Sequence, residues 1–290
     1  MSKQYNRTYE LLITNRETGE TRVIRGLRLN FEITKSVISF PNLCRFTLYN
    51  ANDDTLSLLQ NKLTDVVINA GYFGNVRLLF KGQIRNVFQS KEGPDKMLTV
   101  YSGDGELDWQ NSIFNKTFTA NVSISEAIEE VMESFKNLSV GFVGGLPEDT
   151  RKLRGQTLSG SSKDILDDFA EEYGFNWSIQ NGEIVVVPIE GAIETDEAVV
   201  VNAATGMIGS PIVTEVGANV KTLLNPSLLP NRLFRIESVN ADIAIGNLYF
   251  RGVKRTTATG VYKIQEVTFK GDSREGEWTS FVKGRFLSSA

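Results

Sequence analysis

Two groups of acidic residues have the types and spacing in this sequence that come closest to a catalytic site. The first group is Asp104, Glu106 and Asp108, and the second is Asp272, Glu275 and Glu277. Glycosidases use two carboxyl groups, one as general acid and the other as nucleophile or base. The simpler interpretation is that all six are solvated turn residues, because they follow two similar stretches and adjoin no evident apolar pocket that would raise a pKa. We therefore expect no catalytic residue among them.

Other site chemistries are limited by what the sequence lacks. It contains no histidine and one cysteine, Cys44, which excludes histidine-dependent nucleophiles, histidine-ligated metals and an internal disulfide. A calcium loop starting at Asp104 needs glycine at its sixth position and glutamate at its twelfth, where the sequence has Trp109 and Asn115. We expect neither a metal site nor a cofactor.

Two aromatic and basic triplets, Phe80-Lys81-Gly82 and Phe250-Arg251-Gly252, could stack a base or a sugar. Such a triplet is more often a strand end whose ring lies in the core and whose cation lies in water. We expect the second arrangement.

The elements that position these residues occur twice. Phe80 and Phe250 are 170 positions apart, Asp104 and Asp272 are 168 apart, and Trp109 and Trp278 are 169 apart. A nearly constant offset indicates an internal repeat. The positions that define it are Gly74, Phe80, Gly82, Gly103, Asp104 and Trp109 in the first copy, and Gly246, Phe250, Gly252, Gly271, Asp272 and Trp278 in the second.

Each copy has the pattern of an antiparallel sheet. Apolar and polar residues alternate from Gln265 to Phe269, which is the period of a half-buried strand, and the following Gly-Asp pair is typical of a turn. Trp109 and Trp278 are large enough to cover a core. We expect two related sheets, each closed on itself.

The 290 residues exceed what one hydrophobic core usually fills. The sequence predicts a β-dominated α+β protein with a β-barrel over residues 1-111, a small α+β domain over 112-195 and a second β-barrel over 196-290. The middle domain should contain helices near 123–135 and 161–173, the first with a Ser123/Glu126 capping box, and a hairpin turning at Asn181-Gly182. The glycine-rich stretch from Gly141 to Gly160 is predicted to be loop.

Composition narrows the class of partner. The chain has 31 Lys and Arg against 35 Asp and Glu, giving a net charge of −4, which argues against sequence-specific nucleic-acid binding. Its start is polar and no apolar run approaches membrane-spanning length, so we expect no secretory signal and no membrane insertion.

The order of motifs resembles the baseplate hub proteins of contractile-tailed bacteriophages, and is similar to the hub part of type VI secretion spike proteins. The first copy carries this resemblance in Phe31-Glu32-Ile33-Thr34-Lys35-Ser36, Ile68-Asn69-Ala70-Gly71-Tyr72, Leu79-Phe80-Lys81-Gly82 and Asp104-Gly105. The second carries it in residues 205–211, 224–228 and 267–272, with Trp278. Helix-containing inserts between two barrels are also found in that family.

The resemblance implies a structural protein of the virion tail baseplate, made and assembled in the host cytoplasm. It implies a homotrimer whose tube-like barrels form a pseudo-sixfold ring between the hexameric tail tube and the trimeric central spike. The tail tube protein and the central spike protein are then its partners, with the tape-measure protein as a further candidate. A mild acidic balance would suit a channel through which DNA slides.

Two alternatives from other classes remain open. One is a tail-associated cell-wall hydrolase that uses the acidic turn after Gly103, and the other is a carbohydrate- or receptor-binding tail module. Neither has a sequence motif of its own beyond the residues described above.

Overall fold

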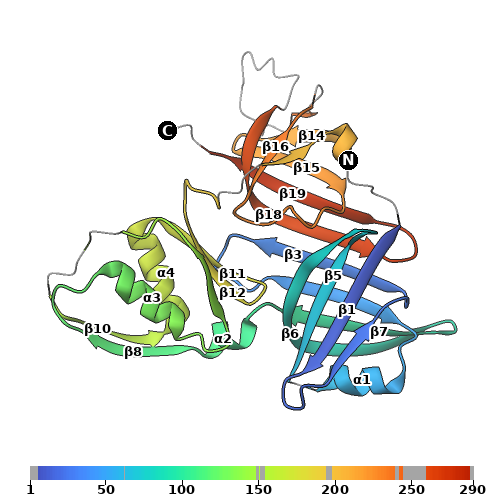
Figure 1. The fold of residues 1–290 in the computed structure, drawn as a ribbon, viewed down its shortest axis with the longest axis horizontal. Coiled ribbons are helices and arrows are strands. Elements are labelled where there is room, and N and C mark those ends of the chain that lie inside the picture. The colour runs from blue at the N-terminus through green and yellow to red at the C-terminus, as the bar shows by residue number, and fades with distance from the viewer. Residues whose placement is uncertain are drawn as a thin grey trace.

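One large sheet dominates the protein (Figure 1). The structure, a computed structural model, describes residues 6–61, 63–147, 150, 154–193, 198–238, 242–243 and 259–287. Fourteen strands within those residues form the sheet. The first segment of the chain supplies β1 (Arg7–Asn15), β2 (Thr21–Ile24), β3 (Leu29–Ser36), β4 (Leu43–Tyr49), β5 (Thr64–Tyr72), β6 (Asn75–Glu92) and β7 (Asp95–Gly103). The last segment supplies β13 (Val199–Val201), β14 (Met207–Val213), β15 (Gly217–Leu223), β16 (Leu233–Ile236), β17 (Asp242–Ile243), β18 (Gly260–Asp272) and β19 (Trp278–Phe286), with a 3-10 turn at Ala203–Thr205.

The two segments join at the antiparallel pair β3 and β18, where Ile33 lies opposite Phe269. On β3, Leu29, Phe31 and Ile33 alternate with half-buried polar residues, as the sequence pattern predicts. The buried apolar side chains of both segments belong to one contiguous core. The β-dominated α+β class is therefore confirmed, and the first and last segments share one sheet.

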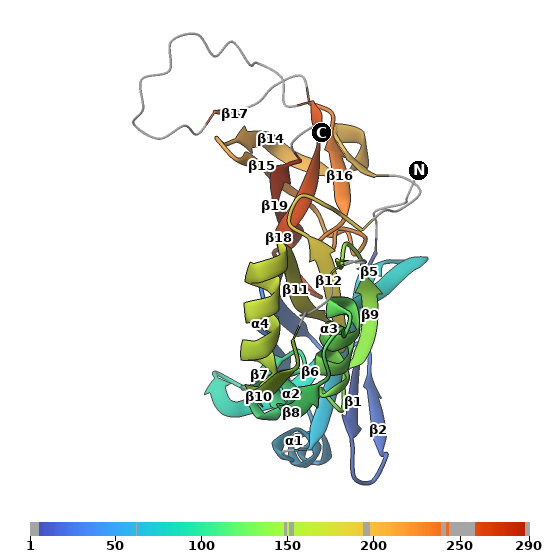
Figure 2. The same ribbon diagram turned by 90° about the vertical axis from the view of Figure 1, so that its left-hand side faces the viewer.

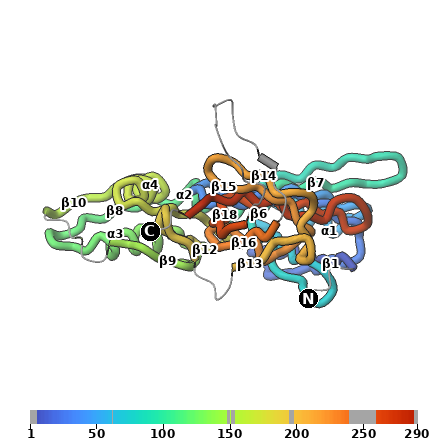
Figure 3. Tube along the Cα trace, turned by 90° about the horizontal axis from the view of Figure 1, so that it is seen from above, coloured from blue at the N-terminus to red at the C-terminus, as the bar shows by residue number. Residues whose placement is uncertain are grey.

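Strand β6 pairs with two neighbouring strands, β5 and β7. Its first part pairs with β5 as far as Gln83, and its second part pairs with β7 from Gln83 onward. The register shifts between Ile84 and Asn86, which is typical of a β-bulge that bends a strand. The far ends of β6 and β7 extend as a long hairpin (Figure 3), beside the short helix α1 (Asp53–Gln60).

The segment between β7 and β13 forms a separate layer beside the large sheet, which we call the insert (Figure 2). It contains α2 (Glu106–Asn111), β8 (Ile113–Phe118), α3 (Ile124–Glu133), β9 (Ser139–Val143), β10 (Gln156–Ser161), α4 (Ser162–Tyr173), β11 (Phe175–Gln180) and β12 (Glu183–Pro188). Strands β8 and β10 form a two-stranded ribbon, and β11, β12 and β9 form a three-stranded sheet. A second core, distinct from that of the large sheet, fills the space between these sheets and the helices α3 and α4.

Local signals set most element ends in the insert. Helix α4 ends at Gly174, whose φ is +73°, and the β11–β12 hairpin turns at Asn181 and Gly182, both with positive φ, so these predictions are confirmed. Ser123 does precede α3, but the capping box is wrong because its hydroxyl bonds to Ser125 and caps no backbone amide.

The prediction of a loop from Gly141 to Gly160 is also wrong at both ends. The first three residues complete β9, which pairs with β12, and the last five belong to β10, which pairs with β8. Pairing with strands distant in the sequence overrides the turn preference of glycine there.

Candidate functional site

The first acidic group lies at the junction between the large sheet and the insert, and its side chains are buried. Asp104 follows β7 and is fully buried, while Glu106 and Asp108 on α2 are 7% and 6% exposed. The expectation of solvated turn residues is therefore wrong for this group. The reason is that the insert folds back over the end of β7 and covers the turn.

Asp104 holds the tip of the β11–β12 hairpin. Its carboxylate accepts hydrogen bonds from the backbone amides of Asn181 and Gly182, the latter at 2.8 Å. Burial raises the pKa of Asp104 to about 6, although the charge of Lys35 and those two hydrogen bonds act in the opposite direction. The carboxylate thus ties the hairpin turn to the end of β7.

Two residues that sequence reasoning missed complete this junction. Lys35 at the end of β3 is fully buried, and its Nζ donates to Asn181 Oδ1 at 2.6 Å. Burial lowers the pKa of Lys35 to about 8, against the stabilising charge of Asp104. Asn42 donates to the carbonyl of Ile179 at 2.6 Å and accepts from the amide of Ser36 at 2.9 Å. The insert is therefore joined to the end of β3, to the residue before β4 and to the residue after β7 through buried and half-buried polar contacts.

Glu106 and Asp108 are bound by protein groups as well. Glu106 pairs with Arg85 and accepts from Gln110 at 3.0 Å. Asp108 accepts from the backbone amide and the side-chain amide of Asn137, at 3.1 and 2.9 Å. The carboxylates of this acidic group therefore accept hydrogen bonds from other parts of the protein and hold those parts in place.

The second acidic group is divided between buried and exposed positions. Asp272 is 5% exposed, whereas the side chains of Glu275 and Glu277 are 73% and 51% exposed. Asp272 accepts from Arg28 Nη2 at 2.8 Å and from the backbone amide of Arg274 at 2.9 Å. Burial alone would raise the pKa of Asp272, but the hydrogen bonds and the charge of Arg28 hold it below its usual value. The solvated-turn expectation is right for the two glutamates and wrong for Asp272.

Replacing Asp272 with asparagine should lower the free energy of unfolding at pH 7 by about 1.5 to 3 kcal/mol, because a charged acceptor is lost. A carboxylate whose folded pKa is depressed stabilises the fold above its unfolded pKa, and this contribution disappears as the pH falls through the folded value. The difference between the unmodified protein and Asp272→Asn should therefore shrink below about pH 4. Urea unfolding from pH 7 down to pH 3 measures it.

The control for that titration is Glu275→Gln, at an exposed position that also pairs with Arg28. It should change the stability by no more than about 0.5 kcal/mol. A difference for Asp272→Asn that grows as the pH falls would contradict the assignment of Asp272 as a stabilising anion.

Of the other repeat positions, Phe80 is fully buried on β6 and Lys81 beside it is exposed, as expected for the first triplet, but the triplet lies within β6 and not at a strand end. Gly74 occupies the turn between β5 and β6 with φ at +83°. A Cβ at Gly82 would approach the carbonyl oxygen of Gly103 to 2.6 Å, so both glycines lie where two strands approach closely. Gly246, Phe250 and Gly252, and with them the second triplet, lie outside the described residues.

The two tryptophans of the repeat lie in different surroundings. Trp278 begins β19, is 2% exposed and contacts the first segment of the chain: its Nε1 donates to the carbonyl of Gly71 at 3.2 Å, and its ring meets Phe31 edge-on at 5.4 Å. A Cβ at Gly271 would collide with the Phe31 ring. Trp109, on α2, is half-buried between Phe40 and the amine of Lys163, which lies 3.6 Å from the ring centroid. Trp278 therefore packs between the two segments, and Trp109 lies beside the insert core.

A second buried lysine fixes the exit from the insert. Lys263 on β18 is fully buried, and its Nζ donates to the carbonyls of Pro188 and Ile189 at 3.1 and 3.3 Å. Burial and the nearby charge of Arg285 lower its pKa to about 8. Lys35 and Lys263 thus anchor the β11–β12 hairpin at its tip and at its end.

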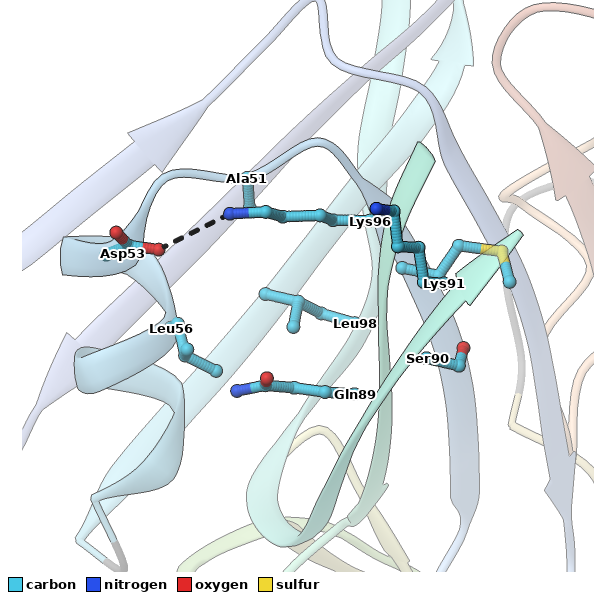
Figure 4. A pocket seen from close by; sticks show the side chains of 9 residues that line it. Ala51, Asp53, Leu56, Gln89, Ser90, Lys91, Lys96 and Leu98 are labelled. Carbon is cyan, nitrogen blue, oxygen red and sulfur yellow. Dashed lines mark ion pairs between the residues drawn. The ribbon is translucent and has the colours of Figure 1, made fainter. Parts of the chain in front are cut away.

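A surface cavity of about 400 Å³ lies between α1 and the β6–β7 hairpin (Figure 4). Asp53 and Lys96 face each other across it at 4.0 Å, and Leu56 and Leu98 form its apolar wall. A single solvent-exposed ion pair of this length is weak and fixes no ligand orientation. The cavity therefore offers no arrangement for catalysis.

Among the described residues, no group of three or more Cys, Asp or Glu side chains could hold a metal ion. None of the helices in the described part of the chain is long and apolar enough to cross a membrane.

Residues 23–249 match a family model described as Baseplate hub gp41. No curated protein matches the chain.

Three solved structures share the fold. The 43 kDa tail protein of prophage MuSo2 from Shewanella oneidensis is 9% identical with a TM-score of 0.61, over 95% of this chain and 96% of that one. The tail protein from Neisseria meningitidis MC58 is 9% identical with a TM-score of 0.61, over 97% of both chains. The E. coli c3393 protein, a component of the type VI secretion system described as similar to the T4 tail proteins gp27 and gp5, is 12% identical with a TM-score of 0.53, over 90% of this chain and 74% of that one.

Proposed function

The chain belongs to the baseplate hub gp41 family and is a structural component of a phage tail, and from this premise we propose that three copies form a ring between the tail tube and the central spike. The resemblance noted from the sequence is thereby confirmed at the level of the family. In the proposed ring, each copy contributes two tube-like units, one from residues 1-111 and one from 196-290, with 112-195 inserted between them.

The observation that carries this proposal is the antiparallel pairing of β3 with β18. It places strands from the first and last segments side by side in one sheet, with Asp104 directly after β7 and Asp272 at the end of β18. If the two segments are duplicated units, three chains present six similar surfaces. Such a ring could bind the sixfold tail tube on one side and the threefold spike on the other. The likeness to tail proteins and to a type VI secretion component supports the same reading.

The expectation that an overall acidic charge suits a DNA channel depends on where the acidic residues lie in the chain. Residues 112–195 contain 14 Asp and Glu against 6 Lys and Arg, whereas residues 1–111 contain 12 against 14 and residues 196–290 contain 9 against 11. The acidic excess therefore lies in the insert. If the flanking segments form the channel wall, DNA would bind weakly to that wall because its lysines are paired with carboxylates.

Three such ion pairs link neighbouring strands. They are Glu32 on β3 with Lys270 on β18 at 2.9 Å, Lys221 on β15 with Glu277 in the turn before β19 at 2.7 Å, and Glu266 on β18 with Lys283 on β19 at 2.7 Å.

The proposed assembly predicts that a complex coexpressed with the spike protein contains three copies of this chain, which add three times 32.2 kDa to the mass of the spike, measured by sedimentation in solution. A reconstruction of the intact tail should place the three copies on the tail axis, between tube and spike. Copies found only at the periphery, or a monomer in both the free and the spike-bound state, would reject the ring and favour a receptor-binding module.

A further inference from the structure

The amine of the buried Lys35 and the side-chain amide of the half-buried Asn181 are in direct contact. Lys35 Nζ lies 2.6 Å from Asn181 Oδ1, and the two residues are 146 positions apart in the chain. Lys35 is fully buried at the end of β3, and Asn181 occupies the hairpin turn with φ at +57°. The nitrogen therefore lies beside the carboxamide group of Asn181.

The surroundings favour amine chemistry at this contact. An amine is nucleophilic only when it is neutral, and burial lowers the pKa of Lys35 to about 8, so a larger fraction is neutral than in an exposed lysine. Holding a nucleophile against its target in a near-attack geometry accelerates a reaction strongly. Here the fold holds the amine within hydrogen-bond distance of the carboxamide without a ligand.

Asp104 acts as a positioning residue. It is fully buried, and its carboxylate accepts the backbone amides of Asn181 and Gly182, which fixes the orientation of the turn that carries the carboxamide. Its negative charge also acts on Lys35. The carboxylate therefore holds the electrophile in place.

We propose that Lys35 and Asn181 react with each other to form an isopeptide bond that links β3 to the tip of the β11–β12 hairpin. Lys35 Nζ attacks Asn181 Cγ, a new carbon–nitrogen bond forms, and the bond from Cγ to Nδ2 breaks. The attacking amine is neutral, and one of its protons passes to the departing Nδ2, so ammonia leaves and atoms and charge balance without an oxidant or co-reactant.

The link ties the insert covalently to the large sheet. It closes a loop of 146 residues, and a cross-link of that span restricts the unfolded chain more than a short one does. The insert could then separate from β3 only by breaking a covalent bond, whatever force acts on the protein.

The test is the intact mass of the purified full-length protein. We expect a loss of about 17 Da, one ammonia, relative to the sequence mass, and a branched tryptic peptide joining the segments that carry Lys35 and Asn181. The full sequence mass would overturn the proposal. A gain of about 1 Da in the peptide that carries Asn181 would overturn it too, because it indicates deamidation of Asn181 through attack by the amide of Gly182.

Two matched variants remove one reactant each. Lys35→Arg keeps the positive charge, and Asn181→Gly keeps a residue suited to positive φ in the turn. Each should show the full mass of its own sequence. Lys263 is the control within the chain, because it is equally buried but faces backbone carbonyls, so its peptides should be recovered unlinked.

The positioning role of Asp104 is tested by the rate at which the link forms. Asp104→Asn should lose ammonia more slowly, and its linked fraction, followed over time, should rise faster at pH 9 than at pH 7, because more of the Lys35 amine is then neutral. A variant that links as completely at harvest as the unmodified protein would overturn this role. If Asp104→Asn is insoluble, the masses of the unmodified protein and the other two variants still decide the proposal.

Discussion

Replacing Trp278 with alanine is expected to lower the free energy of unfolding by about 3 to 5 kcal/mol. The ring is 2% exposed and contacts Phe31 and the backbone of Gly71, both from the first segment of the chain. Its removal leaves a cavity between two segments that share one core, and it leaves the carbonyl of Gly71 without its indole donor. Urea unfolding followed by circular dichroism measures the loss.

Trp109→Ala is the matched control for this experiment. Because Trp109 is half-buried and contacts Phe40 and Lys163 outside the main core, its removal should cost only about 1 to 2 kcal/mol. Equal costs for the two tryptophans would show that they fill equivalent positions, as the sequence repeat alone suggests, and would contradict the packing described here.

Trp177→Ala should cost a similar amount, about 3 to 5 kcal/mol, but in a different part of the molecule. Trp177 on β11 is 2% exposed, packs against Phe135 at 5.9 Å and donates from Nε1 to Asp167 at 2.7 Å. Its neighbours belong to the core of the insert, which is distinct from the core of the large sheet. Hydrogen exchange should therefore accelerate first in β9, β11, β12, α3 and α4.

A suitable control is Phe142→Ala on β9, since that ring is 41% exposed and its truncation should change stability by no more than about 0.5 kcal/mol. If Trp177→Ala accelerated exchange equally in the large sheet and in the insert, the two would unfold as one unit. That outcome would argue against the division of the chain at residues 112 and 195.

Local signals in the sequence predicted much of the secondary structure. The alternation on β3, Gly174 after α4 and the Asn181-Gly182 turn each act within a few residues, so the sequence shows them directly. One clue to the junction was also present, because Lys35 occupies the same face of β3 as Leu29, Phe31 and Ile33. A lysine on a buried face needs a partner, and that rule could have directed attention to it.

The contacts that bury the acidic groups could not be predicted in the same way. Asp104 is bound by amides 77 and 78 positions further along the chain, and Asp272 by Arg28, 244 positions before it. A Gly-Asp pair marks a turn, but it does not show which distant segment covers that turn. Lys263 had no such signal, since three consecutive residues around it are buried and the strand loses its alternation.

The pairing of β3 with β18 has a consequence for biosynthesis. One edge of β3 pairs with the nearby β4, but its other edge, residues 30–36, pairs with residues 266–272, so about 230 further amino acids must leave the ribosome before this second edge is covered. At roughly 5 to 20 residues per second this takes on the order of 10 to 50 s, during which β3 exposes unpaired backbone groups that invite aggregation. Completion of the fold is therefore a late event of high contact order, and slow translation of the last third prolongs the vulnerable interval.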